Sequence, residues 1–284
     1  MLSVTHLSSY LYCPRKLYLE KVLNLYEPPK EALVKGSIRH KVYENINLIE
    51  EELVKSIKKG ITLEDLKGKY HQKYREILLD IISKNKEKLN QFNILPQDLF
   101  KSVWPLILSE SETRATTIHT FIKKHNIFGQ ELWEKLTPKI ESELRIESET
   151  LGLKGVIDQI EIYREGFVPI ELKTGKSPKE GVWPGHKIQL IAYAILIEER
   201  FKTQIKEGFV HYLDTKEKRH IVLNPFMKLE VQELIKKVNE LLISNDIPCF
   251  EKNQNKCVNC GLKEDCYDEK KLKQLLKDKK TTLK

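Results

Sequence analysis

The chain has 284 residues, of which 40% are hydrophobic and 32% are charged, and this balance predicts a globular protein with one large core or two small ones. Its 49 Lys and Arg residues exceed its 41 Asp and Glu residues, and the net charge of +8 favours a polyanionic partner without indicating a sequence preference. No apolar run approaches the roughly 20 residues that span a bilayer, and Met1–Tyr12 lacks a basic stretch followed by an apolar one, so we expect no membrane segment and no secretory signal.

The five cysteines are an odd number in a chain without a visible signal peptide. This combination argues against a disulfide framework and for a reducing compartment. We therefore expect a cytoplasmic protein.

The first region, residues 1–60, is predicted to be helical. Ser3 or Thr5 is expected to cap a helix that is broken at Glu27-Pro28-Pro29, and a second helix is expected from Glu31. The first helix would carry Leu7, Leu11, Tyr18 and Leu19.

Residues 61–136 are rich in Lys, Glu, Leu and Ile at helical spacing, as in the run Ile77, Leu78, Ile81 and Ile82. Pro96 and Pro105 are expected to interrupt the helices. The segment carries no catalytic pattern, and we interpret it as a helical insertion.

Residues 137–246 change character, because polar and apolar residues alternate there as in strands. The expected order is αβββαβ, which predicts an α/β (α+β) fold with a mixed sheet flanked by helices. The expected strands are Glu141–Glu149, Gly152–Tyr163, Phe167–Lys173, Gly208–Leu213 and Arg219–Leu223, and the expected helices follow Pro184 and span Phe226–Ile243.

Residues 247–284 hold three cysteines and a Lys-rich tail from Lys270 to Lys284, which we expect to be frayed. Cys257, Cys260 and Cys266 are spaced Cys-x2-Cys-x5-Cys, and Cys13 stands alone near the start. Close thiolates on one loop with a distant fourth ligand suit a 4Fe–4S cluster, and a structural zinc is the alternative. Cys249 is interpreted as a small apolar filler.

Asp158, Glu171 and Lys173 form the candidate catalytic group. Glu171 and Lys173 lie two apart on one strand and share a face, and a hairpin pairing would bring Asp158 beside them. Two adjacent carboxylates favour a cation such as Mg²⁺, and the lysine would hold an attacking water or neutralise phosphoryl charge. The alternative is an ordinary solvated hairpin surface.

Gln189 and Tyr193 lie four apart on a predicted helix and therefore share a face that could reach substrate phosphate. His40 lies on the second helix, one turn after the small Gly36, and its imidazole would shift metal preference towards Mn²⁺. The alternatives are a polar helix edge and a packed or exposed histidine.

Taken in order, these motifs resemble the RecB-like branch of the PD-(D/E)xK nucleases, and in particular the CRISPR-associated Cas-four family of iron–sulfur exonucleases. The opening Ser9–Lys16 is similar to the start of that family. The matching motifs are Cys13, Gly36-Ser37-Ile38-Arg39-His40, Gly155-Val156-Ile157-Asp158, Glu171-Leu172-Lys173-Thr174-Gly175, Gln189-x3-Tyr193 and Cys257-x2-Cys260-x5-Cys266.

The resemblance implies a restriction-endonuclease-like core, a 4Fe–4S cluster and metal-dependent cleavage of single-stranded DNA ends, which trims fragments for CRISPR adaptation alongside the integrase proteins. It implies that His40, Asp158, Glu171 and the Leu172 carbonyl bind Mn²⁺ or Mg²⁺, with Lys173 catalytic. Gln189 and Tyr193 would match the RecB-type helix motif. The cluster ligands would be Cys13, Cys257, Cys260 and Cys266, which would clasp the two ends of the chain.

The long segment between His40 and Asp158 departs from short family members and resembles a longer, archaeal-type variety. Ile157 also stands where the family usually has Pro. Two other functions stay open: a non-catalytic nucleic-acid-binding subunit of the CRISPR adaptation machinery, and a zinc-stabilised structural protein. Homo-oligomerisation is left open as well.

Overall fold

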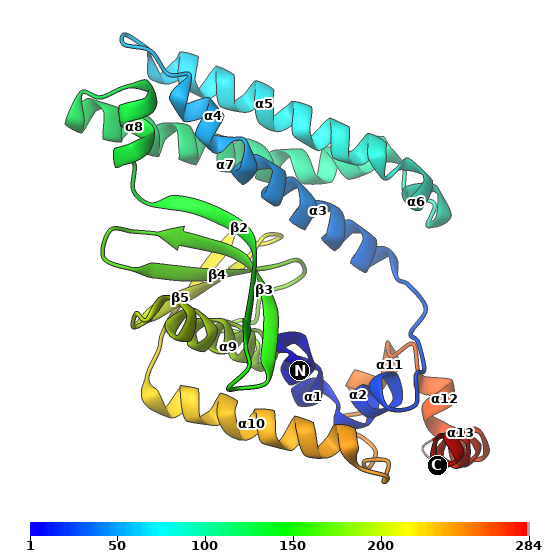
Figure 1. Ribbon diagram of the computed structural model, residues 1–284. Helices are drawn as coiled ribbons and strands as arrows, with labels where there is room; N and C mark the ends of the chain where they lie inside the picture. The colour runs from blue at the N-terminus through cyan, green and yellow to red at the C-terminus, as the bar shows by residue number, and fades with distance from the viewer. Residues whose placement is uncertain (283–284) are drawn as a thin grey trace.

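The computed structural model describes the backbone of residues 1–282 and the side chains of residues 1–278. A mixed six-stranded sheet lies between a layer of long helices and a second layer formed by α9 (Pro184–Phe201) and α10 (Pro225–Ile243), and the C-terminal helices lie beside α2 (Pro14–Lys21) (Figure 1). The strands are β1 (Leu2–Ser3), β2 (Lys139–Ser148), β3 (Leu153–Ile162), β4 (Phe167–Lys173), β5 (Glu207–Tyr212) and β6 (Glu217–Val222). The helices are α1 (Val4–Tyr12), α2 (Pro14–Lys21), α3 (Glu31–Leu48), α4 (Glu50–Lys55), α5 (Leu63–Lys84), α6 (Lys86–Gln91), α7 (Pro96–His125), α8 (Gly129–Lys135), α9 (Pro184–Phe201), α10 (Pro225–Ile243), α11 (Asn255–Val258), α12 (Lys263–Tyr267) and α13 (Glu269–Thr282).

The single helix expected before the Pro28-Pro29 break is in fact two helices, α1 and α2. They are separated by Cys13, whose extended backbone ends α1 and begins α2. Pro14 explains the break, because proline disfavours helical geometry in the residue before it and is well suited to the first position of a helix. The predicted cap at Ser3 is confirmed, since the Ser3 hydroxyl accepts the Thr5 N–H.

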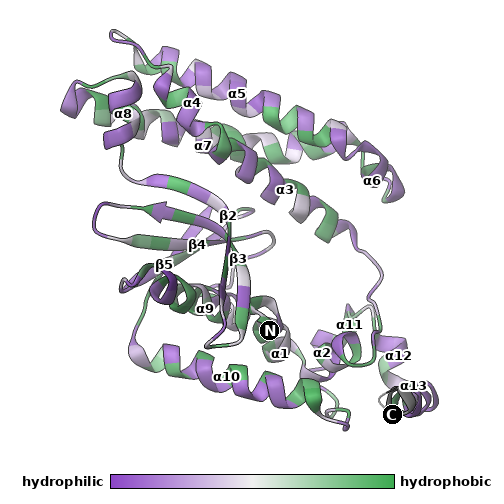
Figure 2. Ribbon diagram, viewed as in Figure 1, coloured by the Kyte–Doolittle hydropathy of each residue, from purple (hydrophilic) through white to green (hydrophobic). Residues whose placement is uncertain are grey.

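The insertion consists mainly of α5 and α7, which lie side by side and show alternating hydrophilic and hydrophobic positions (Figure 2). The expected interruption at Pro105 is wrong, because Pro105 lies inside the continuous helix α7. The buried residues Val103 and Ile107 on either side hold this part of the helix in the core. That packing offsets the loss of about 3 kcal/mol that an interior proline causes. The same hydrophobic core includes residues of α3 and reaches Ile170 and Leu172 of β4.

The sheet has the strand order β1-β3-β4-β5-β6, with β2 paired to β3, and it confirms the predicted mixed sheet. β2, β3 and β4 form an antiparallel meander, β5 runs parallel to β4, and β6 returns antiparallel. β1 was not predicted, because its two residues are too few to show alternation.

Helix α9 covers the opposite face of the sheet from the insertion (Figure 1). Ten consecutive residues, Ile188 to Ile197, are buried, so the helix is enclosed on all sides rather than amphipathic. α10 packs against α9 and completes this layer.

The C-terminal helices pack against α2 in a small separate core. The prediction of a frayed tail is wrong for residues up to 282, because these residues form α13 and Leu272 is only 2% exposed in that core. The last two residues of the predicted tail, 283 and 284, lie outside the described residues. Within residues 1–282, every helix is too short or too polar to cross a lipid bilayer.

Candidate active site and cysteine cluster

The candidate active site lies on β3, between the segment that pairs with β1 and the segment that pairs with β4. On one edge, β3 pairs with β1 at Leu153 and Lys154 and then with β4 from Gln159 onward. At the intervening Asp158, the carboxylate accepts the Leu172 N–H at 2.8 Å, so a side chain takes the place of a ladder partner. A cleft of about 1000 Å³ opens at this part of β3. It is lined by Asp158, Glu171, Lys173, Gln189 and Tyr193.

Glu171 is the most deeply buried acid of the cleft, with an exposed fraction of 2%. Its Oε1 lies 2.5 Å from Lys173 Nζ, whereas its Oε2 is buried without a hydrogen-bond partner among the described residues. Burial and the nearby Asp158 charge raise the pKa of Glu171 to about 7, although Lys173 opposes the shift. A buried, unpartnered carboxylate oxygen beside a second acid suits a metal cation.

Lys173 carries the positive charge of this group. Burial lowers its pKa, but the adjacent Glu171 and Asp158 outweigh burial and raise the pKa above its usual value. Lys173 is therefore an ammonium at neutral pH, able to donate hydrogen bonds into the cleft.

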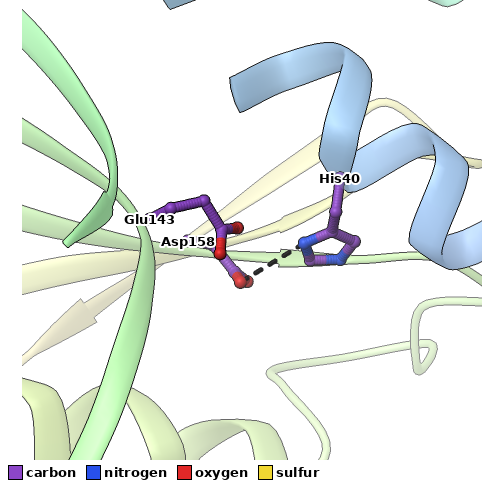
Figure 3. A group of neighbouring side chains, drawn as sticks. All are labelled: His40, Glu143 and Asp158. Atoms are coloured by element: carbon purple, nitrogen blue, oxygen red, sulfur yellow. Dashed lines mark ion pairs between the residues drawn. The ribbon is translucent and has the colours of Figure 1, made fainter. Parts of the chain in front are cut away.

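His40 reaches the site from α3, and its Nδ1 lies 3.3 Å from Asp158 Oδ1 (Figure 3). Burial lowers the pKa of His40, but the hydrogen bond and charge of Asp158 raise it overall. Gly36 allows a close approach of the chain one turn before His40, because a Cβ at position 36 would lie 3.2 Å from Thr174 Oγ1. The Gly36–His40 motif and the Glu171–Gly175 motif therefore pack directly against each other.

Glu143 is the site residue that sequence reasoning missed. It lies on β2 with φ of 56°, at the position that the β2–β3 ladder skips between the pairs Ser142–Gln159 and Leu144–Ile157. The ligand atoms of Glu143, His40 and Asp158 all lie within 4.8 Å of one another (Figure 3). The sequence offers Glu141, Glu143 and Glu147 on one strand, and only the register with β3 distinguishes Glu143.

The carboxylates of Glu143 and Glu171 both lie near that of Asp158, and the three acids repel one another. Burial and the Asp158 charge raise the pKa of Glu143, as they do for Glu171. This repulsion is relieved by a divalent cation with oxygen ligands. The geometry therefore fits a metal held by His40, Glu143 and Asp158, whereas the predicted ligand Glu171 lies outside this group and its part in metal binding stays a prediction. Of the predicted Leu172 contribution, the structure shows the N–H bond to Asp158, and the role of the carbonyl stays a prediction.

We expect Glu143→Gln to weaken Mn²⁺ binding about tenfold, because it removes a charge from the ligand group while keeping the side-chain shape. Titration calorimetry measures this affinity. Glu141→Gln is the matched control, since Glu141 lies on the same strand but is exposed. Equal affinities in the two variants would exclude Glu143 from the site.

Gln189 and Tyr193 are both buried on α9 and line the same cleft, which confirms that they share a face. A Cβ at position 155 would lie 2.6 Å from Tyr193 Cε1, so the glycine of the Gly155–Asp158 motif is what admits the ring. The wall of the cleft also carries Arg145, Lys154 and Arg200, which makes it suited to phosphate.

The four predicted cluster cysteines line one small cavity between α2 and the C-terminal segment: Cys13, Cys257, Cys260 and Cys266. Cys249 is exposed, so its interpretation as an apolar filler is wrong. Among the described side chains, His40, Glu143 and Asp158 form the group of possible metal ligands whose ligand atoms lie within 4.8 Å of one another. No three cysteine sulfurs of the described residues lie within that distance of one another. Tetrahedral zinc, with Zn–S of about 2.3 Å, would require sulfurs roughly 3.8 Å apart.

Arg15 joins the two cysteine-bearing segments. Its Nε donates to Cys266 Sγ at 3.1 Å, and its terminal nitrogens donate to the carbonyls of Cys266 and Pro248. The guanidinium also lies over the Phe250 ring, 3.9 Å from its centroid. A buried cation bonded to a cysteine sulfur would suit a negatively charged metal–thiolate centre at this place.

Glu27 forms a second bridge between the segments, because its carboxylate accepts hydrogen bonds from Lys16, Lys30 and the Gly261 N–H. Burial raises the pKa of Glu27, but these bonds outweigh burial and lower it from 4.5 to about 2. A depressed folded-state pKa stabilises the fold above the unfolded value, and the stabilisation is lost as the pH falls towards 2.

Glu27→Gln is therefore expected to reduce the free energy of unfolding by about 1–2 kcal/mol at neutral pH. In urea unfolding, the difference from wild type should persist down to about pH 4.5 and shrink below it, between the two pKa values of Glu27. Glu20→Gln is the control. Glu20 Oε1 also lies near Lys16 Nζ, but at the longer distance of 3.6 Å. If the difference in the free energy of unfolding between Glu27→Gln and wild type stayed the same at low pH, Glu27 would not act as an ionised bridge between the segments.

The sequence is similar to that of known nucleases. The profile of the PD-(D/E)XK nuclease superfamily matches residues 1–267. A CRISPR-associated exonuclease Cas4/endonuclease Cas1 fusion of Leptospira interrogans is 30% identical over 50% of this chain and 28% of its own length. The CRISPR-associated exonuclease Cas4 of Francisella tularensis is 27% identical over 44% of this chain and 61% of its own length.

The DNA replication ATP-dependent helicase/nuclease JHS1 of Arabidopsis thaliana is 26% identical over 90% of this chain and 19% of its own length. The chain thus spans less than two thirds of each of these relatives. The profile match nevertheless covers nearly the whole chain, including the cleft with Asp158, Glu171 and Lys173. The chain belongs to the PD-(D/E)XK nuclease superfamily.

Proposed function

We propose that this protein is a metal-dependent deoxyribonuclease that acts on single-stranded DNA ends. The observation that carries the proposal is Glu171, a fully buried acid with an unpartnered oxygen, placed beside Asp158 and Lys173 in a cleft with basic walls. A structural hairpin has no need of such an arrangement, because burying an unsatisfied carboxylate is costly.

A bound Mg²⁺ or Mn²⁺ would supply Lewis-acid stabilisation of phosphoryl charge and a more acidic water. The residues suited to hold it are His40, Glu143 and Asp158, with the buried Glu171 proposed as a further ligand from the same cleft. Lys173, as an ammonium, orients the attacking water and neutralises charge that builds on the phosphate oxygens. Gln189 and Tyr193 orient the phosphate from the facing helix.

The cysteine cavity is proposed to hold a 4Fe–4S cluster. The sulfur spacing supports this cofactor over a single zinc, because the sulfurs lie further apart than tetrahedral zinc requires. The position of the cavity, between α2 and the C-terminal helices, supports a structural role. A brown anaerobic preparation with broad absorption near roughly 400 nm supports the cluster, and a colourless zinc-bearing one refutes it.

The cellular role proposed is trimming of DNA during CRISPR adaptation, with the integrase Cas1 as partner. Two relatives are named as fusions of Cas4 to Cas1, which supports physical association of the two activities. The test is co-purification of this protein with the Cas1 of its own genome on size exclusion. Separate elution at micromolar concentrations of both proteins would count against the partnership.

A second role is favoured by the extent of one alignment. The helicase/nuclease relative from Arabidopsis matches 90% of this chain, including the helical insertion, whereas the Leptospira fusion matches 50%. A nuclease that works with a helicase on replication intermediates would account for this. Cleavage of forked DNA flaps in preference to linear single strands would support the second role over the first.

The direct test of activity is degradation of labelled single-stranded and duplex oligonucleotides with Mn²⁺ or Mg²⁺. Release of short products from the single strand alone supports the proposal. Tight DNA binding without cleavage under either metal would instead indicate a non-catalytic subunit.

A further inference from the structure

A second cleft of about 960 Å³ adjoins the candidate active site. It lies between α1, the loop that follows β4 and the start of α9. Gln189 lines both clefts, so the second one continues from the metal-binding acids towards the cysteine segment.

Two aromatic side chains are fixed in this cleft although they are largely exposed. Trp183 is 47% exposed, yet its indole N–H donates to the Lys176 carbonyl at 3.0 Å and its backbone N–H donates to the Tyr212 hydroxyl at 3.1 Å. Tyr12 is 44% exposed, and its hydroxyl donates to the Lys256 carbonyl at 2.9 Å. The ammonium groups of Lys16 and Lys256 lie 6.0 and 5.6 Å from the Tyr12 ring centroid, so these cations share the space over the Tyr12 ring with any base stacked there. Rigid exposed aromatic faces bind flat apolar groups at low entropic cost.

The polar lining of the second cleft is basic or neutral. The cleft is lined by Lys16, Lys176 and Lys256 and by no Asp or Glu among the described residues. Lys16 also pairs with Glu27, and Lys256 with Glu251, so Lys176 is the lysine whose charge is most available to a phosphate. His186 is neutral at neutral pH, because burial and the Lys173 charge lower its pKa to about 4. The chemistry complements a ligand that carries phosphates along one side and flat rings along the other.

We propose that this cleft binds the single-stranded part of the DNA substrate beyond the scissile phosphate, with bases stacked on Trp183 and Tyr12 and phosphates near the lysines. The inference rests on the proposed nuclease function and names a binding surface for it. A single strand fits because only unpaired bases present free faces for stacking. The cleft thereby explains a preference for single strands that the metal site alone does not.

The test is fluorescence anisotropy with a labelled oligonucleotide of about 25 nucleotides, longer than the roughly 4–16 nucleotides of common single-strand sites, without divalent metal. Trp183→Ala is expected to weaken binding about tenfold, consistent with the loss of one stacked base. Trp183→Phe should retain most of the affinity. Phe226→Ala is the matched control, because Phe226 is an exposed aromatic residue on α10, outside the cleft.

Wild-type affinity in Trp183→Ala, or equal losses in Trp183→Ala and Phe226→Ala, would overturn the proposal. A second measurement uses wild-type protein alone: photo-crosslinking to an oligonucleotide that contains 5-iodouracil, followed by peptide mapping. Crosslinks at Trp183 or Tyr12 support the cleft, and crosslinks confined to the insertion refute it. Binding of the oligonucleotide without cleavage would refute the nuclease function and leave the binding cleft standing. Failure of the cleft and failure of the nuclease function are therefore distinguishable.

Discussion

Lys173→Ala is expected to reduce the rate of DNA hydrolysis by about 10²–10³-fold, comparable to the loss of one preorganised donor at developing negative charge. Lys173 is the ammonium closest to the buried acids, 2.5 Å from Glu171 Oε1. Its removal also takes away a positive charge that repels a bound cation and competes for Glu171, so metal affinity should rise. Single-turnover cleavage at saturating Mn²⁺ separates the two effects.

The control for this variant is Lys236→Ala, because Lys236 is an exposed lysine of α10 that pairs with Glu233 on the same helix, outside the cleft. It should cleave at the wild-type rate. If Lys173→Ala were as active as Lys236→Ala at saturating metal, Lys173 would have no part in the chemistry.

Cys13→Ser is expected to abolish visible absorption and to lower the melting temperature by about 10 °C. The small core between α2 and the C-terminal helices has few buried side chains, so the metal centre would supply much of its stability. A loss of roughly 3–4 kcal/mol corresponds to this shift at about 3 °C per kcal/mol. Iron analysis and thermal unfolding measure both effects.

Cys249→Ser is the matched control, since Cys249 is exposed and lies outside the cysteine cavity. It should keep its iron and its melting temperature. Equal iron content in both variants would exclude Cys13 as a ligand. Zinc in place of iron in the anaerobic wild-type protein would refute the cluster itself.

The nuclease core could be predicted from the sequence because its signals are local. Alternation and turn residues gave β2 to β6 and the helices α9 and α10, and they placed Glu171 and Lys173 on one strand. The proximity of Asp158 also followed, because an antiparallel meander leaves little freedom of register when its strands have a buried face.

The errors arose where distant contacts decide the outcome. Glu143 faces Asp158 only through the β2–β3 register and a backbone φ of 56°, which alternation does not reveal. Pro105 stays helical because tertiary packing outweighs its local preference, and α13 is ordered by burial of Leu272 against α2. The helix predicted through Cys13 is divided there because Pro14 disfavours helical geometry in the residue before it, an effect that hydrophobic spacing does not reveal.

The central claim is that Asp158 helps to bind a divalent cation that makes the cleft hydrolytic. Its most direct test is cleavage of a labelled single strand as a function of Mn²⁺ concentration, by wild type and by Asp158→Asn. The substitution preserves an oxygen that can accept the Leu172 N–H but removes the charge. We predict metal-dependent cleavage by wild type and none by Asp158→Asn at any Mn²⁺ concentration; equal rates, or cleavage by wild type in excess chelator, would contradict the account.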